Sequence, residues 1–206
     1  MKSIICIGRE YGSGGREIGE GLAQALEIPC YDKLLIKKAA LASGLSEEFI
    51  SKAEDSPIGS FQFISGNVCA DIASIGGAFY SGGQAAYDAE RSVIEQLTRQ
   101  EPCVIIGRCA SSIIPKEQRL SVFIYANKND AVNRIMRRNG IGEKDAAHRI
   151  RHMNRMRRQY FDFYSDTEWG RPESYDAMLS SSRFGIEGCI KIIRDILAEQ
   201  EEPGNE

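Results

Sequence analysis

The stretch that decides the fold is IICIGREYGSGGRE, residues 4–17. Its first four residues are apolar, and glycines follow at positions 8, 12, 14 and 15. Beyond them, apolar side chains recur at helical spacing, at Ile18, Leu22, Ala25 and Leu26. The pattern predicts a buried strand, a tight glycine loop and a helix that ends at Pro29.

A glycine loop between a buried strand and a helix can bind a phosphate group. Its backbone N–H groups close around the anion, and the helix N-terminus adds partial positive charge. A turn whose glycines serve backbone geometry alone is the alternative. A dinucleotide-binding loop is disfavoured, because GxGxxG requires a glycine where Glu17 stands. The residues expected to bind the phosphates of ATP are Gly12, Ser13, Gly14, Gly15, Arg16 and Glu17.

The loop departs from the P-loop consensus GxxxxGK[ST]. With Gly12-Ser13-Gly14 as the reference, Gly15 occupies the lysine position. With Gly15 as the second consensus glycine, Arg16 takes the lysine place and Glu17 the Ser/Thr place, in a longer loop. The second register predicts that Arg16 supplies the catalytic cation. Glu17 and Ser13 are the candidate ligands of Mg²⁺.

Short apolar runs alternate with helical patterns along the rest of the chain. Strands are expected over 103–106, 120–125 and 175–179. Helices are expected over 32–42, from 84 to Pro102, and over 130–139, 143–164 and 186–197, with Asp32 as the N-cap of the first. The alternation predicts an α/β fold in which a parallel sheet lies between helices.

The composition is that of a folded globular chain: 206 residues, 42% hydrophobic and 27% charged. The longest apolar runs are only a few residues, so no membrane-spanning segment is expected. The start MKSII lacks the apolar stretch of a signal peptide, which predicts a cytoplasmic protein. Scattered cysteines, and two histidines in one basic segment, favour reduced buried thiols over a disulfide frame or a zinc site.

Positive charge is concentrated in residues 134–158, which carry nine Lys or Arg and two acids within a chain of net charge −3. A basic island on an acidic protein favours a specific anionic ligand over nucleic acid. The helices expected over 130–139 and 143–164 are joined by Gly140-Ile141-Gly142. They are predicted to form a lid that closes over transferring phosphates. A solvated helix face is the alternative.

A second glycine–arginine motif, Gly107-Arg108, follows the apolar run 103–106. Ligands bind at the carboxyl ends of strands in open parallel sheets, so Arg108 is expected at that edge of the sheet. Its planar guanidinium can bind a phosphate with two parallel hydrogen bonds. An exposed loop arginine without a ligand is the alternative. A Walker B acid is expected near Ile106 and is missing there.

These motifs together resemble the cytidylate kinase-like proteins, a branch of the P-loop nucleoside monophosphate kinases. The matching segments are IGREYGSGGR at 7–16, YDK at 31–33, VIIGR at 104–108, RRQYF at 157–161, WG at 169–170 and YD at 175–176. The resemblance implies a P-loop kinase-like fold. It also implies phosphoryl transfer from ATP, with Mg²⁺, to a small acceptor, for which CMP is the first candidate. It implies that Asp32 and Arg108 bind the acceptor. It also implies that Arg134, Arg138 and Arg157 are catalytic lid arginines.

The chain is expected to be one domain over 1–206, with an acceptor-side insertion at 43–90 and lid-like helices at 134–165. Within the insertion, 56–83 is rich in glycine and aromatic residues and nearly uncharged, which makes it a candidate surface for a second subunit.

Two alternatives to a nucleotide kinase stay open. The missing P-loop lysine is compatible with a nucleotide-binding sensor or regulator without turnover. The unusual insertion is compatible with a kinase of a non-nucleotide small molecule. The expected partners are small-molecule nucleotides, with neither nucleic acid nor membrane.

Overall fold

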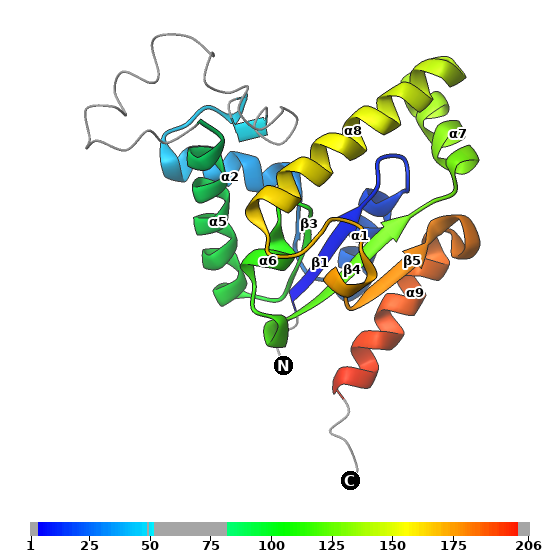
Figure 1. Cartoon of the computed structure of the whole chain (residues 1–206). Helices are drawn as coiled ribbons and strands as arrows, with labels where there is room; N and C mark the ends of the chain where they lie inside the picture. Colours follow the sequence, from blue (N-terminus) through cyan, green and yellow to red (C-terminus); the bar gives the residue numbers. More distant parts are fainter. Residues whose placement is uncertain (1–3, 49, 52–81, 202–206) are drawn as a thin grey trace.

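Residues 4–48, 50–51 and 82–201 are described by a computed structural model of the chain (Figure 1). In these residues, one sheet contains five strands in the order β2-β3-β1-β4-β5. All neighbouring strands are parallel, so the predicted parallel α/β sheet is confirmed. The strands are β1 (Ile4–Arg9), β2 (Cys30–Tyr31), β3 (Cys103–Ile106), β4 (Arg119–Tyr125) and β5 (Ala177–Ser180).

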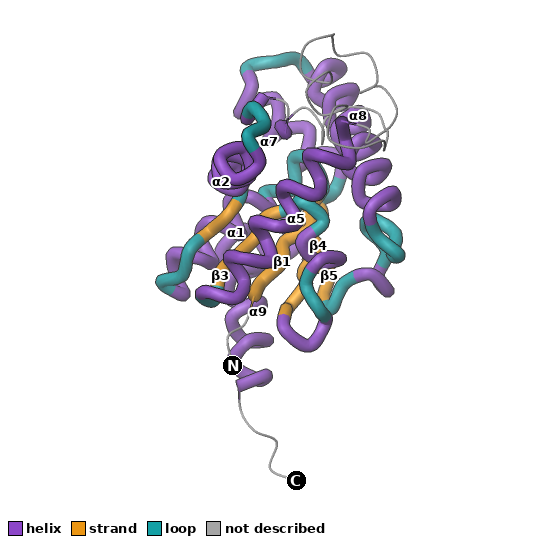
Figure 2. Tube along the Cα trace, turned by 90° about the vertical axis from the view of Figure 1, so that its left-hand side faces the viewer, coloured by secondary structure: helices purple, strands orange, loops and turns teal. Residues whose placement is uncertain are grey.

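Helices cover both faces of this sheet (Figure 2). Successive residues of a strand point to opposite faces. Ile5 and Ile7 therefore pack on the side of α1 and α9, whereas Ile4 and Cys6 pack on the side of α2 and α5. The helices are α1 (Gly15–Leu26), α2 (Lys33–Ser43), α5 (Gly82–Gln100), α6 (Ala110–Ile113), α7 (Lys128–Asn139), α8 (Glu143–Tyr164) and α9 (Ser181–Glu201).

The helices α7 and α8 lie above the carboxyl ends of the strands, and α8 passes over the loop that follows β1 (Figure 1). Gly140 ends α7 in the left-handed conformation, with φ 64°, as helix C-caps commonly do. The predicted bounds of α8 and of β3 are confirmed to the residue.

The motifs near the C-terminal half pack together as one aromatic cluster. Its buried members include Tyr160, Phe161, Trp169 and Tyr175, gathered on Phe123 of β4. The ring centroids of Phe123 and Trp169 are 5.1 Å apart in an edge-to-face arrangement, which is a favoured geometry for aromatic pairs. This cluster fixes the C-terminal half of α8 against the sheet.

Several boundary predictions were wrong for local reasons. The helix α1 ends at Leu26, because Glu27 adopts a left-handed conformation (φ 54°) before Pro29 is reached. Asp32 does occupy the predicted N-cap position of α2, but its side chain makes no capping hydrogen bond. The last strand begins at residue 177 rather than 175, because Tyr175 closes a short 3₁₀ helix (Pro172–Ser174).

Three elements or extensions went unpredicted. The strand β2 contains only two residues, and α6 only four, which is too short for a periodic pattern to register. The helix α9 begins earlier than expected, at Ser181, with a break in helical geometry at Gly185. Within the predicted insertion 43–90, residues 52–81 lie outside the described part of the chain, and so does Cys69.

The described cysteines are free thiols, and all but Cys30 are buried. Burial raises the pKa of Cys6 and of Cys103 to about 12, so both stay protonated near neutral pH and pack as small apolar groups. In the described helices, none is both long and apolar enough to cross a lipid bilayer.

Candidate functional site

The candidate site is a cavity of about 580 Å³ at the carboxyl ends of β1 and β3, called the large cavity below. All of the residues predicted from the sequence except Ser13 line it: Gly12, Gly14, Gly15, Arg16, Glu17, Asp32, Arg108, Arg134, Arg138 and Arg157. Segments far apart in the chain therefore meet at the sheet edge where ligands of parallel sheets bind.

The glycines of the loop have a clear geometric basis. Gly12 and Gly14 lie in the left-handed region, with φ 87° and 81°. A Cβ atom on Gly12 would lie 3.0 Å from the carbonyl oxygen of Ala131, and one on Gly14 would lie 2.7 Å from Cδ1 of Ile186. Neighbouring helices thus press on the loop from two sides, and this packing requires glycines with or without a phosphate.

Ser13 braces the loop from inside and does not face the large cavity. Its side chain is fully buried. Its hydroxyl donates to the carbonyl of Glu10 at 2.9 Å and accepts from the N–H of Gly15 at 3.3 Å. The Ser13 carbonyl accepts from the hydroxyl of Ser181 at 2.5 Å. As a magnesium ligand, Ser13 would have to give up these contacts, whereas Glu17 is exposed and lines the cavity.

Arg16 lies among carboxylates on the first turns of α1. Its Nε is 2.9 Å from a carboxylate oxygen of Glu20 and 3.3 Å from one of Asp32. The hydrogen bond to Glu20 raises the pKa of Arg16, and Asp32 adds to the effect. Asp32 is thus paired with Arg16 instead of capping α2, and the charge of Arg16 is already balanced before any ligand binds.

Glu10 and Tyr11, between the first two glycines, are cavity residues that the sequence analysis did not single out. Burial raises the pKa of Glu10, against a hydrogen bond from the N–H of Ala126 that favours the carboxylate. The backbone N–H of Tyr11 donates to Oδ1 of Asn154 at 2.6 Å. The glycine loop is therefore tied to β4 and α8.

The helices α7 and α8 hold the loop through their arginines. Arg134 donates to the carbonyl of Gly12 at 2.5 Å, and Arg157 donates to the carbonyl of Arg9 at 3.2 Å. The guanidinium groups of Arg138 and Arg157 lie over the Tyr11 ring, at 4.9 and 5.4 Å from its centroid. Such cation–π contacts are stabilising. Arginines predicted to face a phosphate thus also contact the loop that would hold it.

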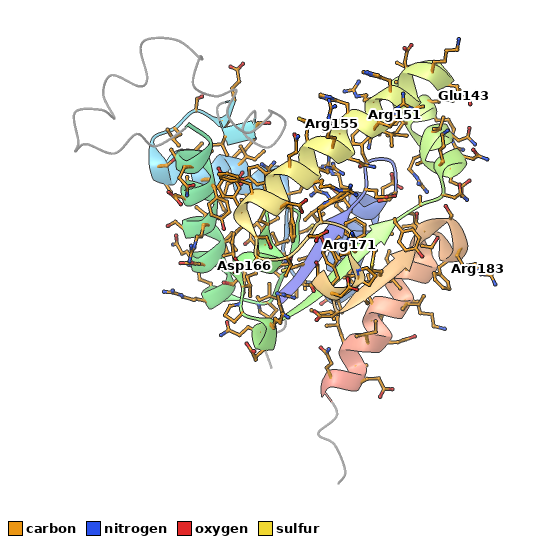
Figure 3. The ribbon with its side chains drawn as sticks, in the orientation of Figure 1. Glu143, Arg151, Arg155, Asp166, Arg171 and Arg183 are labelled. Atoms are coloured by element: carbon orange, nitrogen blue, oxygen red, sulfur yellow. The ribbon has the colours of Figure 1, made fainter. Side chains whose placement is uncertain are left out.

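The basic segment divides into two faces. Arg151 and Arg155 are exposed and lie on the outer side of α8, away from the sheet (Figure 3). Arg134, Arg138 and Arg157 lie on the side that faces the loop. Arg151 and Arg155 therefore fit a solvated helix face, whereas Arg134 and Arg157 are partly buried and Arg138, although exposed, contacts the loop.

Arg108 is buried, so the alternative of an exposed loop arginine is wrong. Its Nη1 is 2.7 Å from Oε1 of Glu90, and the hydroxyl of Tyr160 donates to Oε2 of Glu90 at 3.1 Å. Glu90 was missed, although its signal was present: it is an acid on the apolar face of α5, at helical spacing from the buried Ala86 and Ile94.

The turn after β3 is strained. Gly107, Arg108 and Cys109 all have left-handed backbones, with φ 77°, 60° and 52°. Non-glycine residues adopt this region at a cost, and such residues cluster at functional sites. A small cavity of about 30 Å³ lies beside this turn, and Arg9, Arg108 and Arg157 line both it and the large cavity.

Comparison with known proteins places the chain in a kinase-like family. A model described as the cytidylate kinase-like family matches residues 4–183. A solved structure of an uncharacterized protein from Eubacterium ventriosum is 26% identical, with a TM-score of 0.70, and the match covers 95% of this chain and 98% of that one. Searching the curated proteins returned no match.

Two shikimate kinases share the fold. The enzyme from Bacteroides thetaiotaomicron has a TM-score of 0.54 at 14% identity, with 95% of this chain and 98% of that chain covered. The enzyme from Acinetobacter baumannii, solved in complex with shikimate, has a TM-score of 0.55 at 13% identity, with 98% and 96% covered. These likenesses confirm the P-loop kinase-like fold expected from the sequence.

Proposed function

Because the chain belongs to the cytidylate kinase-like family, we propose that it transfers the γ-phosphoryl group of ATP to a small phosphorylated acceptor. CMP is the first candidate for this acceptor. The family and the fold support the coarser activity, phosphoryl transfer to a small molecule. The acceptor and the roles of individual residues belong to the proposal.

One observation carries the proposal. A glycine loop at a helix N-terminus and the buried Arg108 line the same cavity, with arginines of α7 and α8 beside them. Phosphoryl transfer requires positioning and charge stabilisation more than covalent chemistry. A donor phosphate at the loop and an acceptor phosphate at Arg108 would meet within this cavity.

The residues take the following roles in the proposal. Gly12, Gly14, Gly15 and the first backbone N–H groups of α1 hold the donor phosphates. Arg108 binds the acceptor phosphate, and Asp32 binds the rest of the acceptor. Arg134, Arg138 and Arg157 stabilise charge on the transferring group, with Arg16 at the edge of the same cavity.

The residues present also fit a magnesium ion. Mg²⁺ keeps several waters and takes one or two carboxylates besides substrate phosphate oxygens. Glu17 supplies a carboxylate at the start of α1, whereas Ser13, the second candidate from the sequence, is buried and hydrogen-bonded within the loop. The ion would neutralise charge on the donor phosphates.

The transfer step needs no catalytic base when the acceptor is a phosphate. An anionic oxygen of the acceptor phosphate forms a bond to the γ-phosphorus, and the bond from that phosphorus to the bridging oxygen of ADP breaks. ADP leaves with the electron pair, and CMP becomes CDP. Because a phosphate monoester is largely dianionic near neutral pH, no proton has to be removed.

The experiment is an ATP-consumption assay with purified protein and a panel of acceptors: CMP, the other nucleoside monophosphates, shikimate and other small non-nucleotide acceptors. Formation of CDP or another nucleoside diphosphate supports the proposal. A Gly14→Val variant, checked for folding by its melting temperature, controls for contaminating kinases. If ATP is consumed only with a non-nucleotide acceptor, the protein is a kinase of that small molecule and the assignment of CMP is wrong.

A sensor without turnover is the second candidate function, and one observation favours it. The cation predicted to replace the P-loop lysine, Arg16, is already paired with Glu20 and Asp32. Tight ATP binding with no consumption across the whole panel would establish this candidate. Thermal shift would detect the binding, since ligand at 100 times its Kd stabilises a fold by about 2.7 kcal/mol.

A further inference from the structure

We propose that Arg9, the last residue of β1, supplies the loop cation that a lysine supplies in the P-loop consensus. This inference rests on the proposed function and names a further catalytic residue for it. In the sequence, one of two possible registers predicts Arg16 for that role. The structure provides a reason to prefer the other register.

The space beside Gly15 is the first feature that favours Arg9. In the register based on Gly12-Ser13-Gly14, Gly15 occupies the lysine position, and it is also the first residue of α1. A Cβ atom on Gly15 would lie 2.6 Å from Cβ and 3.3 Å from Cγ of Arg9. The stem of Arg9 therefore fills the space in which a lysine side chain at position 15 would begin. The two side chains exclude one another.

The path of the Arg9 side chain beyond its stem is the second feature that favours this role. A Cβ atom on Gly107 would coincide with the guanidinium of Arg9. The guanidinium thus lies directly on the backbone of the turn after β3, next to Arg108. The N–H of Gly107 donates to the carbonyl of Ile7 at 3.0 Å and holds that turn against β1. Arg9 spans from the donor loop to the acceptor turn because both contact positions are glycines.

The surroundings of the Arg9 guanidinium are the third feature that favours this role. Arg9 lines both the large and the small cavity, together with Arg108 and Arg157. A phosphoryl group moving between the loop and Arg108 would pass the position that Arg9 occupies. The fork of a guanidinium can bind two phosphate oxygens at once.

The test compares Arg9→Ala and Arg9→Met with the wild type; the Met variant keeps the unbranched stem. Arg91→Ala is the matched control, because Arg91 is an exposed arginine in an i,i+4 pair with Glu95, remote from the cavity. We expect both Arg9 variants to lose about 10²- to 10³-fold in kcat, as when a preorganised charge donor is removed. Arg91→Ala should match the wild type.

A binding measurement separates loss of the Arg9 charge from a general disturbance of the site. AMP lacks the β- and γ-phosphates, so Arg9→Met should weaken ATP binding and leave AMP binding nearly unchanged. Equal losses for ATP and AMP, at an unchanged melting temperature, would overturn the inference. This measurement also works if the protein binds ATP without turning it over.

A double variant tests the exclusion directly. Gly15→Lys alone places its Cβ against Arg9 and should reduce activity, whereas Arg9→Gly with Gly15→Lys restores the consensus arrangement. The double variant should recover part of the activity that Arg9→Gly loses, and recovery supports the inference. If the wild type consumes ATP and Arg9→Met does so equally well, the inference fails while the proposed function stands. If the wild type neither binds nor consumes ATP, the proposed function itself fails.

Discussion

The turns that follow β1 and β3 lie side by side at the same edge of the sheet, yet they achieve left-handed backbone geometry differently. After β1, the residues with positive φ are Gly12 and Gly14, for which this conformation is not strained. After β3, only the first of three consecutive left-handed residues is a glycine; Arg108 and Cys109 follow it. The second turn is therefore strained where the first is relaxed.

The difference teaches where a side chain is required. At Gly12 and Gly14 the loop after β1 presents backbone to the cavity, so glycine suffices at these two positions. The turn after β3 presents the guanidinium of Arg108, which glycine cannot supply, and its strain is offset by the buried contact with Glu90 at 2.7 Å. Strained residues persist only where surrounding structure over-determines them, and the network of Glu90 and Tyr160 provides that support.

The largest effect is expected from Glu90→Gln. The variant removes the carboxylate charge beside the buried guanidinium of Arg108, and breaking a buried pair typically costs about 3–5 kcal/mol. Denaturant unfolding of the variant and the wild type measures the loss. Tyr160→Phe is the matched control, because it removes one hydrogen bond to the same carboxylate and should cost less. Similar stabilities for Glu90→Gln and the wild type would show that the strained turn does not depend on this pair.

Gly107→Ala should be the next in size, at about 1–3 kcal/mol, because alanine is strained at φ 77° and its methyl group also displaces the flexible end of the Arg9 side chain. Gly44→Ala is a matched control: Gly44 has φ 73° and open space where a Cβ would be. The control isolates backbone strain, so the difference in unfolding free energy between the two variants reports the collision with Arg9. A Gly107→Ala variant no less stable than the control would show that displacing the end of the Arg9 side chain costs nothing, against this prediction.

Replacing Arg108 by alanine and by glycine distinguishes the role of its side chain in acceptor binding from the strain of its backbone. Both Arg108→Ala and Arg108→Gly should raise the acceptor KM by about 10- to 100-fold, the equivalent of a lost charged hydrogen bond, while the ATP KM changes little. Arg108→Gly should be the more stable of the two by about 1 kcal/mol, because φ 60° is strained for alanine and not for glycine. Steady-state kinetics and denaturant unfolding measure the two effects. Parallel rises in both KM values would contradict the acceptor assignment.

The smallest effect concerns the pH dependence of the loop after β1. Burial raises the pKa of Glu10 above its ordinary value of 4.5. The folded state therefore binds this proton more tightly than the unfolded state, and the associated stability is present at low pH and lost as the pH rises through the folded-state pKa. Glu10→Gln removes this dependence. The stability of the variant relative to the wild type should increase from pH 4 to pH 7, and a constant or falling difference would be evidence against a buried carboxylate.

Local patterns were sufficient to predict most of the fold. The bounds of β3 and α8 are as predicted, because an apolar run between loop residues and a long periodic stretch each carry their own signal. The two-residue strand β2 was missed for lack of such a signal. The glycine loop and Gly107-Arg108 were also recognised as cavity residues, because glycine and arginine that follow apolar strands are conspicuous in sequence.

The sequence by itself determined that a glycine loop, an arginine turn and a basic helical pair belong to one parallel α/β fold of the cytidylate kinase-like family. Only the tertiary structure decided which partner each charged group meets. Arg108 pairs with Glu90, 18 residues away, and Tyr11 is held by Asn154, 143 residues away. The Arg9 side chain occupies the space that Cβ atoms on Gly15 and Gly107 would need. Helix and strand patterns arise from neighbours along the chain, whereas charge pairing and steric exclusion arise from neighbours in space.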